Sequence, residues 1–364
     1  MPGPARVLIV DDSRIFRAAL AEALTGQEGI VVVGSVFSGE KALEFLRASP
    51  VDVVTLDVEM PGLDGLQTLA AIQRLNASRP LEAEIGVIMV SAFTSRGADV
   101  TVRALQAGAF DFVTKPSSAR AESNLAELRR QLTCQIRLFL ARRSVADAAQ
   151  VERVQAPGRL RPARSAHVAR PVRAVLIASS TGGPRALDAL LPDLRRRVEL
   201  PVLIVQHMPP RFTQSLAESL ARRVGGRVVE AADGDHVQSG TVYIAPGGRH
   251  LVLRSQGGRV LTGLNDQPPE NHCRPSADVL FRSAAAALGG EAVAVVLTGM
   301  DCDGTAGLRP LKRAGAYVIA QDEATSVVWG MPGSVVRAGL ADEVLPLGDI
   351  AAAVQALVGG QGAH

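Results

Sequence analysis

The sequence of 364 residues has few aromatic residues, few cysteines and no long apolar run. Its three cysteines, Cys134, Cys273 and Cys302, cannot build a disulfide framework and lack metal-site spacing, so we expect free thiols. No apolar stretch approaches the roughly 18 residues that cross a membrane, and no signal-peptide pattern is present. We therefore expect a cytoplasmic protein without membrane insertion.

Charge is nearly balanced overall but is unevenly placed along the chain. The net charge is +3, yet residues 120–173 contain 12 arginines and only four acids. Such a segment could attract an acidic partner or nucleic acid. Its one aromatic residue, Phe139, cannot provide a stacking platform for single-stranded nucleic acid. We interpret the segment mainly as a solvated linker and expect no nucleic-acid partner.

The first half of the chain alternates short apolar stretches with helical patterns. A composition of 47% hydrophobic and 21% charged residues is typical of a globular protein, and the length suits two domains. Strand patterns occupy 7–10, 31–33, 52–56, 85–90 and 110–114, and helical patterns occupy 13–24, 39–46, 66–75, 99–107 and 122–142. Five such units predict a doubly wound parallel sheet.

The second half is also of α/β type and follows a segment without apolar periodicity. Residues 144–171 are rich in proline and arginine, which predicts a linker. Strand patterns then resume at 172–178, 202–205, 228–231, 242–245, 293–297 and 317–320. Two alternating runs within 251–264 flank Gln256-Gly257-Gly258 and predict a hairpin. We expect a first domain at 1–143 (core 5–122), and a second doubly wound domain at 172–364 whose mostly parallel sheet has this antiparallel hairpin at its edge.

Acidic residues follow two strands of the first predicted sheet. Asp11 and Asp12 follow the first strand, and Asp57 follows the third. The first and third strands are adjacent in this topology. Singly each acid could cap a helix, but three converging carboxylates need a cation, and oxygen ligands suit Mg²⁺. Asp57 is then a carboxylate nucleophile for a phosphoryl group. Lys115, after the fifth strand, and Ser91, after the fourth, could contact that group.

A different set of side chains follows the strands of the second sheet. Ser180 lies in a glycine-rich turn between a strand and a helix, and His207 ends the next strand. Asp301 and Asp303 both follow the strand at 293–297 and compete for one role. A serine, a base and an orienting acid predict a hydrolase. A dinucleotide site is the alternative for the turn, but the glycine spacing does not match Gly-x-Gly-x-x-Gly.

The first half resembles the receiver domain of two-component response regulators over about residues 5–125. The matching motifs are Asp11-Asp12, Asp57-Val58-Glu59-Met60-Pro61-Gly62, Gly65, Ser91-Ala92 and Lys115-Pro116. The resemblance implies that a chemotaxis histidine kinase phosphorylates Asp57 and that the reaction needs Mg²⁺.

The second half resembles the catalytic domain of chemotaxis protein-glutamate methylesterases over about residues 172–358. The matching motifs are Ser180-Thr181-Gly182-Gly183, Gln206-His207-Met208-Pro209-Pro210, Tyr243-Ile244-Ala245-Pro246-Gly247, Arg274-Pro275-Ser276 and Leu297-Thr298-Gly299-Met300 with Asp303-Gly304. Ala178-Ser179 departs from the usual Gly-Ala, and the linker is longer and more basic than in familiar members.

This second resemblance implies specific roles and partners. It makes Ser180 the nucleophile, His207 the base and Asp303, rather than Asp301, the orienting acid. Thr181, Met300 and Arg274 become candidates for oxyanion or substrate contacts. The substrates are expected to be glutamate methyl esters and glutamines of methyl-accepting chemotaxis receptors, with no cofactor for the ester chemistry.

Two other functions remain open from the residues alone. A response regulator with a DNA-binding output has only the basic segment in its favour, since no helix-turn-helix pattern follows residue 171. A phosphorylation-gated binding module with an inactive triad is the other alternative. Covalent labelling of Ser180 by a phosphonate distinguishes such a module from an enzyme.

Overall fold

The structure is a computed structural model that describes residues 3–80, 83–115, 121–152 and 171–359. The chain divides into two compact units, Met1–Gly158 and Arg159–His364, which we describe separately. No helix in the described ranges has the length and apolar character needed to span a membrane.

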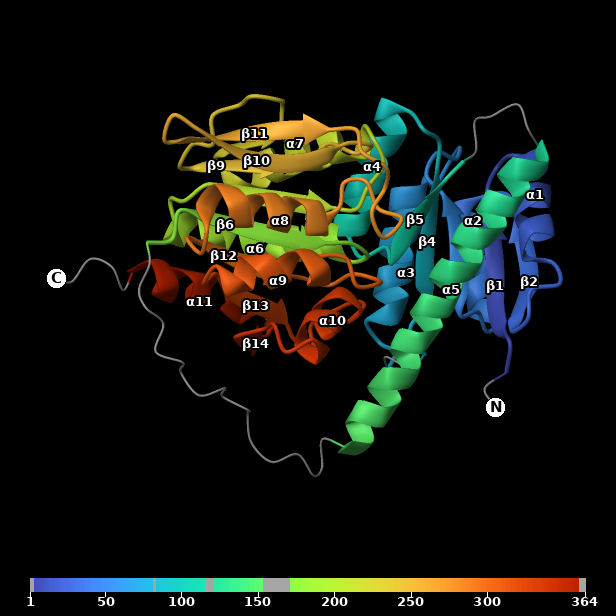
Figure 1. The fold of residues 1–364 in the computed structure, drawn as a ribbon. Coiled ribbons are helices and arrows are strands. Elements are labelled where there is room, and N and C mark those ends of the chain that lie inside the picture. Colours follow the sequence, from blue (N-terminus) through green and yellow to red (C-terminus); the bar gives the residue numbers. More distant parts are fainter. Residues whose placement is uncertain (1–2, 81–82, 116–120, 153–170, 360–364) are drawn as a thin grey trace. The chain divides into compact units, whose positions relative to one another are not determined.

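The first unit is a five-stranded parallel sheet with helices on both faces (Figure 1). Its strands are β1 (Ala5–Val10), β2 (Ile30–Val36), β3 (Val53–Asp57), β4 (Gly86–Ser91) and β5 (Asp111–Thr114). Its helices are α1 (Arg14–Leu24), α2 (Gly39–Ala48), α3 (Gly65–Asn76), α4 (Ser95–Gln106) and α5 (Ala121–Glu152). The strand order β2-β1-β3-β4-β5 confirms the predicted doubly wound topology.

Local signals explain where these helices begin. The Ser13 hydroxyl accepts a hydrogen bond from the amide of Phe16 and caps α1, and Asp64 with Gln67 forms a capping box at α3.

The end of α5 differs from the prediction, because the helix continues to Glu152 instead of ending near 142. The predicted linker at 144–171 therefore begins with helix, since residues 144–152 contain neither proline nor glycine. Most of the remaining linker lies outside the described residues.

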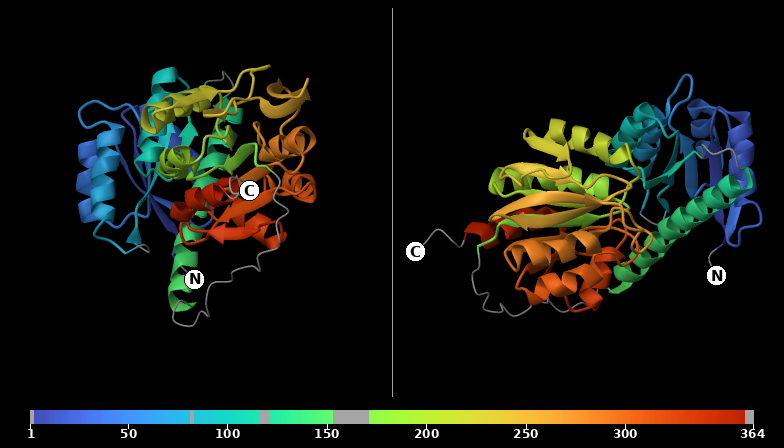
Figure 2. Two further views of the ribbon diagram at one scale, coloured as in Figure 1. Left: turned by 90° about the vertical axis from the view of Figure 1, so that its left-hand side faces the viewer. Right: turned by 45° about the horizontal axis from the view of Figure 1, so that its top comes forward.

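The second unit is built around a seven-stranded sheet. Its strands are β6 (Ala174–Ser179), β7 (Val202–Gln206), β8 (Arg227–Glu230), β9 (Thr241–Ile244), β12 (Ala292–Val296), β13 (Tyr317–Gln321) and β14 (Glu343–Leu345). Its helices are α6 (Gly183–Arg197), α7 (Phe212–Val224), α8 (Ala277–Leu288), α9 (Thr305–Arg313), α10 (Met331–Arg337) and α11 (Leu347–Gly359). Helices α6, α7 and α11 cover one face and α8, α9 and α10 the other (Figures 1 and 2).

The antiparallel hairpin predicted for 251–264 is present as β10 (His250–Gln256) and β11 (Arg259–Asn265). It forms a separate two-stranded sheet instead of the edge of the seven-stranded sheet. The physical reason is its packing on α8: Leu251 and Leu253 enter the same apolar core as Phe281, and the Leu253 amide donates to the Ser283 hydroxyl. The strand order is β14-β13-β12-β6-β7-β9-β8, and every adjacent pair runs parallel.

Both sheets reverse their winding direction beside their first strand. In the first unit β1 lies between β2 and β3, and in the second β6 lies between β12 and β7. The carboxyl ends of parallel strands at such a switch point form the usual ligand site of an open α/β sheet. Residues that follow β1 and β3, or β6, β7 and β12, are therefore placed side by side.

Candidate functional site

The carboxyl ends of β1 and β3 bring three carboxylates together in the first unit. One oxygen from each of Asp11, Asp12 and Asp57 lies within 4.8 Å of the others. Asp11 and Asp57 are buried, whereas Asp12 is exposed. The Lys115 ammonium contacts Asp11 Oδ2 and Asp57 Oδ2, each at 2.8 Å, and lies over the ring of Phe16.

The electrostatics of this cluster favour additional positive charge. Burial raises the pKa of Asp57 to about 6, and the neighbouring Asp11 adds to the increase, although Lys115 opposes it. A single lysine therefore leaves part of the carboxylate repulsion uncompensated. Three hard oxygen donors around partly exposed space suit Mg²⁺, so the residues present fit such an ion.

Ser91 ends β4, which is the neighbour of β3, but its hydroxyl has other partners. It donates to the carbonyl oxygens of Gly97 at 3.2 Å and Ala92 at 3.3 Å. The structure therefore places Ser91 at the same end of the sheet as Asp57 without a direct hydrogen bond to it.

The turn that carries Ser180 connects β6 to α6 in the second unit. The Ser180 amide donates to the Thr298 carbonyl at 3.0 Å, and its own carbonyl accepts from Gly183 N and Gln206 Nε2. Gly182 has φ +80, and a side chain there would meet Val327 at 2.5 Å. Only glycine allows this close approach, so the turn holds Ser180 at the start of α6.

Ser179 precedes Ser180 but has a structural position. Its side chain is fully buried, and its hydroxyl donates to Gln206 Oε1 at 2.7 Å. Gln206 in turn donates to the Ser180 carbonyl at 3.0 Å. The two residues thereby fix the backbone of the Ser180 turn, and Ser180, which is partly exposed, is the serine that faces outward.

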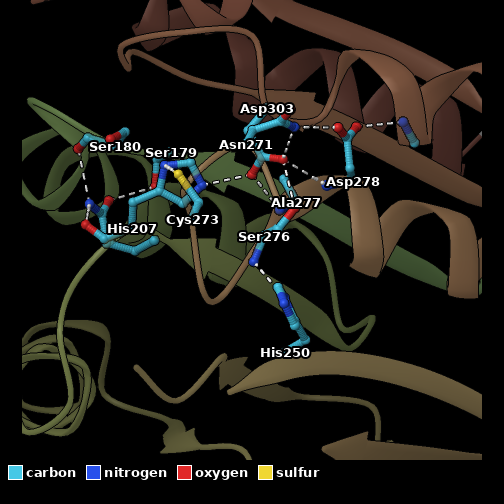
Figure 3. Close-up of polar contacts among 12 residues, drawn as sticks. Ser179, Ser180, His207, His250, Asn271, Cys273, Ser276, Ala277, Asp278 and Asp303 are labelled. Carbon is cyan, nitrogen blue, oxygen red and sulfur yellow. Dashed lines mark hydrogen bonds and ion pairs between the residues drawn. The ribbon is translucent and has the colours of Figure 1, made fainter. Parts of the chain in front are cut away.

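A histidine and a carboxylate from the neighbouring strand ends form the central pair of the site (Figure 3). His207 follows β7, Asp303 follows β12, and His207 Nε2 lies 2.8 Å from Asp303 Oδ2. Asp303 is fully buried. Asp301, the competing acid, is exposed and has φ +66. The structure therefore brings Asp303, and not Asp301, to His207.

Asp303 is surrounded by hydrogen-bond donors in addition to His207. They are the Ser276 hydroxyl at 2.7 Å and the backbone amide of Ala277 at 2.6 Å, with Asn271 Nδ2 at 3.2 Å and the Asp278 amide at 3.3 Å. Burial alone would raise the pKa of Asp303, but hydrogen bonds from His207, Ser276 and Ala277 outweigh it and lower the pKa to about 2. Asp303 is therefore ionised at neutral pH.

Asp278 is a second buried carboxylate close to Asp303. Burial raises its pKa, and the charge of Asp303 adds to the increase. Asn271 Nδ2 bridges the two acids, donating to Asp278 Oδ2 at 2.8 Å as well as to Asp303. Asn271 therefore separates two like charges that share one buried region (Figure 3).

Both ring nitrogens of His207 have a neighbour. Nε2 faces Asp303, and Nδ1 lies 3.5 Å from the sulfur of Cys273. Burial opposes the charged imidazolium, but the hydrogen bond to Asp303 and the contact with Cys273 outweigh it and raise the pKa of His207. Among the described residues no hydrogen bond joins the Ser180 hydroxyl to this ring, which is common before a substrate is bound.

The other predicted contact residues have the following surroundings. Thr181 is buried, and its carbonyl accepts from the Thr298 hydroxyl at 2.9 Å. Met300 is partly exposed in the loop after β12. Arg274 donates through Nη1 to the carbonyls of Asp266 and Gln267, so its guanidinium supports the loop that contains these two residues.

Several residues of the site were not anticipated as such from the sequence. Gln206 and Ser276 lie inside motifs that carried the family resemblance, so a signal for them was available. Asn271 and Cys273 lie in a loop with no regular pattern, and only the fold brings them to Asp303 and His207. Each of the three cysteines is a free thiol, as predicted.

Comparisons with known families agree with this geometry. Residues 175–354 match the CheB methylesterase family, and residues 7–126 match the response regulator receiver domain. A protein-glutamate methylesterase/protein-glutamine glutaminase of Azospirillum brasilense is 42% identical, with 95% of this chain and 91% of that protein covered. The protein of the same description from Geobacillus kaustophilus is also 42% identical, with 97% of this chain and 99% of that protein covered.

A solved structure is similar to the second unit alone. The crystal structure of the Thermotoga maritima CheB methylesterase catalytic domain matches with 45% sequence identity and a TM-score of 0.50. The match covers 52% of this chain and all of that one. The second unit thus has the fold of a methylesterase catalytic domain.

Proposed function

The chain belongs to the CheB methylesterase family, and from this we propose that it uses Ser180, His207 and Asp303 to hydrolyse glutamate methyl esters on methyl-accepting chemotaxis receptors. Protein-glutamine glutaminase activity follows from the same family, because an amide differs from an ester only in its leaving group. The catalytic domain corresponds to residues 172–364.

One observation supports the site assignment most strongly. The His207–Asp303 pair is formed by the ends of β7 and β12, the two strands that flank the one that leads into Ser180. A serine hydrolase needs a nucleophile, a base and an orienting carboxylate in this order of contact. The order along the chain differs from the three familiar orders of serine hydrolases, but the roles depend on geometry and not on chain order.

The positions of the protons define the reaction steps. In the neutral ring, ionised Asp303 accepts a hydrogen bond from the N–H at Nε2 of His207, which leaves the lone pair of Nδ1 to act as the base. Ser180 Oγ attacks the ester carbonyl as its proton moves to Nδ1, and the imidazolium then protonates the departing methoxide. Water attacks the acyl-enzyme by the same route and releases glutamate. We assign the stabilisation of the oxyanion to backbone amides near Thr181 and Met300, together with the start of α6.

The first unit supplies control by phosphorylation. A histidine kinase transfers a phosphoryl group to Asp57, and Lys115 is placed to pair with its oxygens. Mg²⁺, held by Asp11, Asp12 and Asp57, would neutralise charge on the transferring phosphoryl group. Phosphorylation adds about −1.5 to −2 charges beside Asp11, and Lys115 and Ser91 must change partners to accommodate them. That rearrangement is the signal that activates the esterase.

The function is tested by methanol release from receptor membranes that carry methyl esters. Wild-type protein should release methanol, and Ser180→Ala should lose about 10⁴- to 10⁶-fold in turnover without a change in its thermal unfolding midpoint. A phosphonate probe should label wild-type protein and not Ser180→Ala. A folded wild-type protein that neither releases methanol nor takes the label would instead support the binding module with an inactive triad.

A further inference from the structure

His207, Cys273 and Asp303 form a cluster of three metal-ligating side chains next to the Ser180 turn (Figure 3). One ligand atom from each residue lies within 4.8 Å of the other two. Ester hydrolysis by a serine has no step that uses a thiol. The contact of Cys273 with the base therefore points to a second property of this site.

The distance between the two softer ligands suits a single zinc ion. Zn–S bonds of about 2.3 Å and Zn–N bonds of about 2.0 Å at a tetrahedral angle place the two ligand atoms about 3.5 Å apart. His207 Nδ1 and Cys273 Sγ are separated by 3.5 Å. Both residues are partly exposed, so a hydrated ion can reach them.

The other side of the imidazole is also arranged as in metal sites. A histidine that binds zinc commonly donates its second ring N–H to a carboxylate, which fixes the ring and increases its basicity. Here Nε2 lies 2.8 Å from Asp303 Oδ2, and Asp303 is itself held by Ser276 and Ala277. In the neutral ring with its proton on Nε2, the lone pair of Nδ1 is therefore on the side of the thiol.

The donor atoms distinguish this cluster from the one in the first unit. Imidazole and thiolate ligands select zinc over magnesium, whereas the three carboxylates around Asp57 suit magnesium. We therefore expect the cluster of His207, Cys273 and Asp303 to prefer zinc and the cluster around Asp57 to prefer magnesium. The two clusters can be loaded separately in the same protein.

We propose that His207 Nδ1 and Cys273 Sγ, supported by Asp303, bind a zinc ion that inhibits the esterase. The inference rests on the proposed function, because it takes His207 as the general base. On binding, zinc displaces the proton of the Cys273 thiol and, where the ring is charged, the proton on Nδ1, and the lone pair of Nδ1 is then donated to zinc. That nitrogen can then no longer accept the proton of Ser180, and a chelator that removes the ion restores the base.

The metal site is tested first without any activity measurement. Full-length, metal-free protein is titrated with Co²⁺, whose thiolate charge-transfer absorption reports sulfur ligation and is insensitive to carboxylate sites. Wild-type protein and the matched control Cys302→Ala should develop the band at one equivalent and lose it when Zn²⁺ is added. Cys273→Ala and Cys273→Ser should not develop it. A band that persists in both Cys273 variants would overturn the assignment.

Inhibition is tested next by methanol release at controlled free Zn²⁺, with each variant normalised to its own rate in chelator. Two protein ligands are fewer than the three of catalytic zinc sites, so we expect zinc to inhibit wild type and Cys302→Ala to the same degree and chelator to reverse the inhibition. Cys273→Ala should need at least about 10-fold more zinc. Equal sensitivity of wild type and Cys273→Ala would refute the inference. A protein with the cobalt band but no esterase activity in chelator would instead refute the proposed function and leave the metal site standing.

Discussion

Replacing Asp303 by asparagine tests the catalytic geometry most directly. The carboxylate accepts three donors on Oδ1 (Ser276, Asn271 and the Asp278 amide) and two on Oδ2 (Ala277 and His207). An amide has only one accepting oxygen. If that oxygen faces the first group, the Ala277 amide loses its acceptor. If it faces the second group, Asn271 and the Asp278 amide lose their acceptor, whereas the Ser276 hydroxyl can rotate to another partner. The first orientation is therefore favoured.

In that orientation the amide NH₂ of the new side chain faces His207 Nε2. The ring must then accept at Nε2 and carry its proton on Nδ1, which is the nitrogen that should take the proton of Ser180. A triad histidine locked in the wrong tautomer loses roughly 10⁴-fold in turnover. The unpaired Ala277 amide should also lower the free energy of unfolding by about 1–3 kcal/mol.

The assay compares Asp303→Asn with Asp301→Asn in methanol release and thermal unfolding. Asp301 is exposed at φ +66, and asparagine tolerates this backbone region well, so the control should keep nearly full activity and stability. The reasoning fails if Asp303→Asn retains activity within tenfold of wild type. It also fails if Asp301→Asn loses as much as Asp303→Asn.

Three further outcomes are expected. Ser179→Ala should keep the chemistry but lower stability by about 1–3 kcal/mol in chemical denaturation, because Gln206 Oε1 loses its buried donor; an inactive Ser179→Ala beside an active Ser180→Ala would reverse the two roles. Asp57→Asn should keep basal methanol release and lose stimulation by a small phosphodonor with Mg²⁺, and stimulation that persists would place the phosphorylation site elsewhere. The kcat/KM of wild type should keep rising with pH above the ordinary histidine pKa of about 6.5, because His207 must be neutral to accept a proton and its pKa is raised; a profile that is flat above pH 6.5 would contradict this.

The sequence was sufficient to predict most of the fold because both sheets have strongly apolar, fully buried strands. The runs at β3, β4, β6 and β12 consist of buried residues throughout, and such runs produce an unmistakable pattern. The predicted end of α5 near residue 142 was wrong. Residues 144–152 contain no proline or glycine that would end the helix, and it continues to Glu152. The three-residue strand β14 was missed, since Glu343–Leu345 is too short and too polar to produce a periodic signal.

The same distinction holds for the candidate site. Residues that follow strands could be predicted from the sequence, whereas residues in loops could not. Ser180, His207 and Asp303 each follow a strand, so the topology alone predicts that they meet. The other partners of Asp303 come from residues 271–278, which are the loop before α8 and the first residues of that helix. The path of this loop depends on tertiary packing, and it carries no periodic pattern.

The same division explains why the contact between Cys273 and His207 was not foreseen. A cysteine in a loop is normally a small neutral residue, and its meaning depends on which atom the fold places beside it. Here that atom is Nδ1 of His207. Because Asp303 accepts a hydrogen bond from Nε2, Nδ1 is available both to Ser180 and to a metal. One orienting carboxylate therefore makes the histidine a base and also makes it a ligand. Whether the site is active or inhibited then depends on whether Nδ1 meets the serine or a zinc ion bound by Cys273.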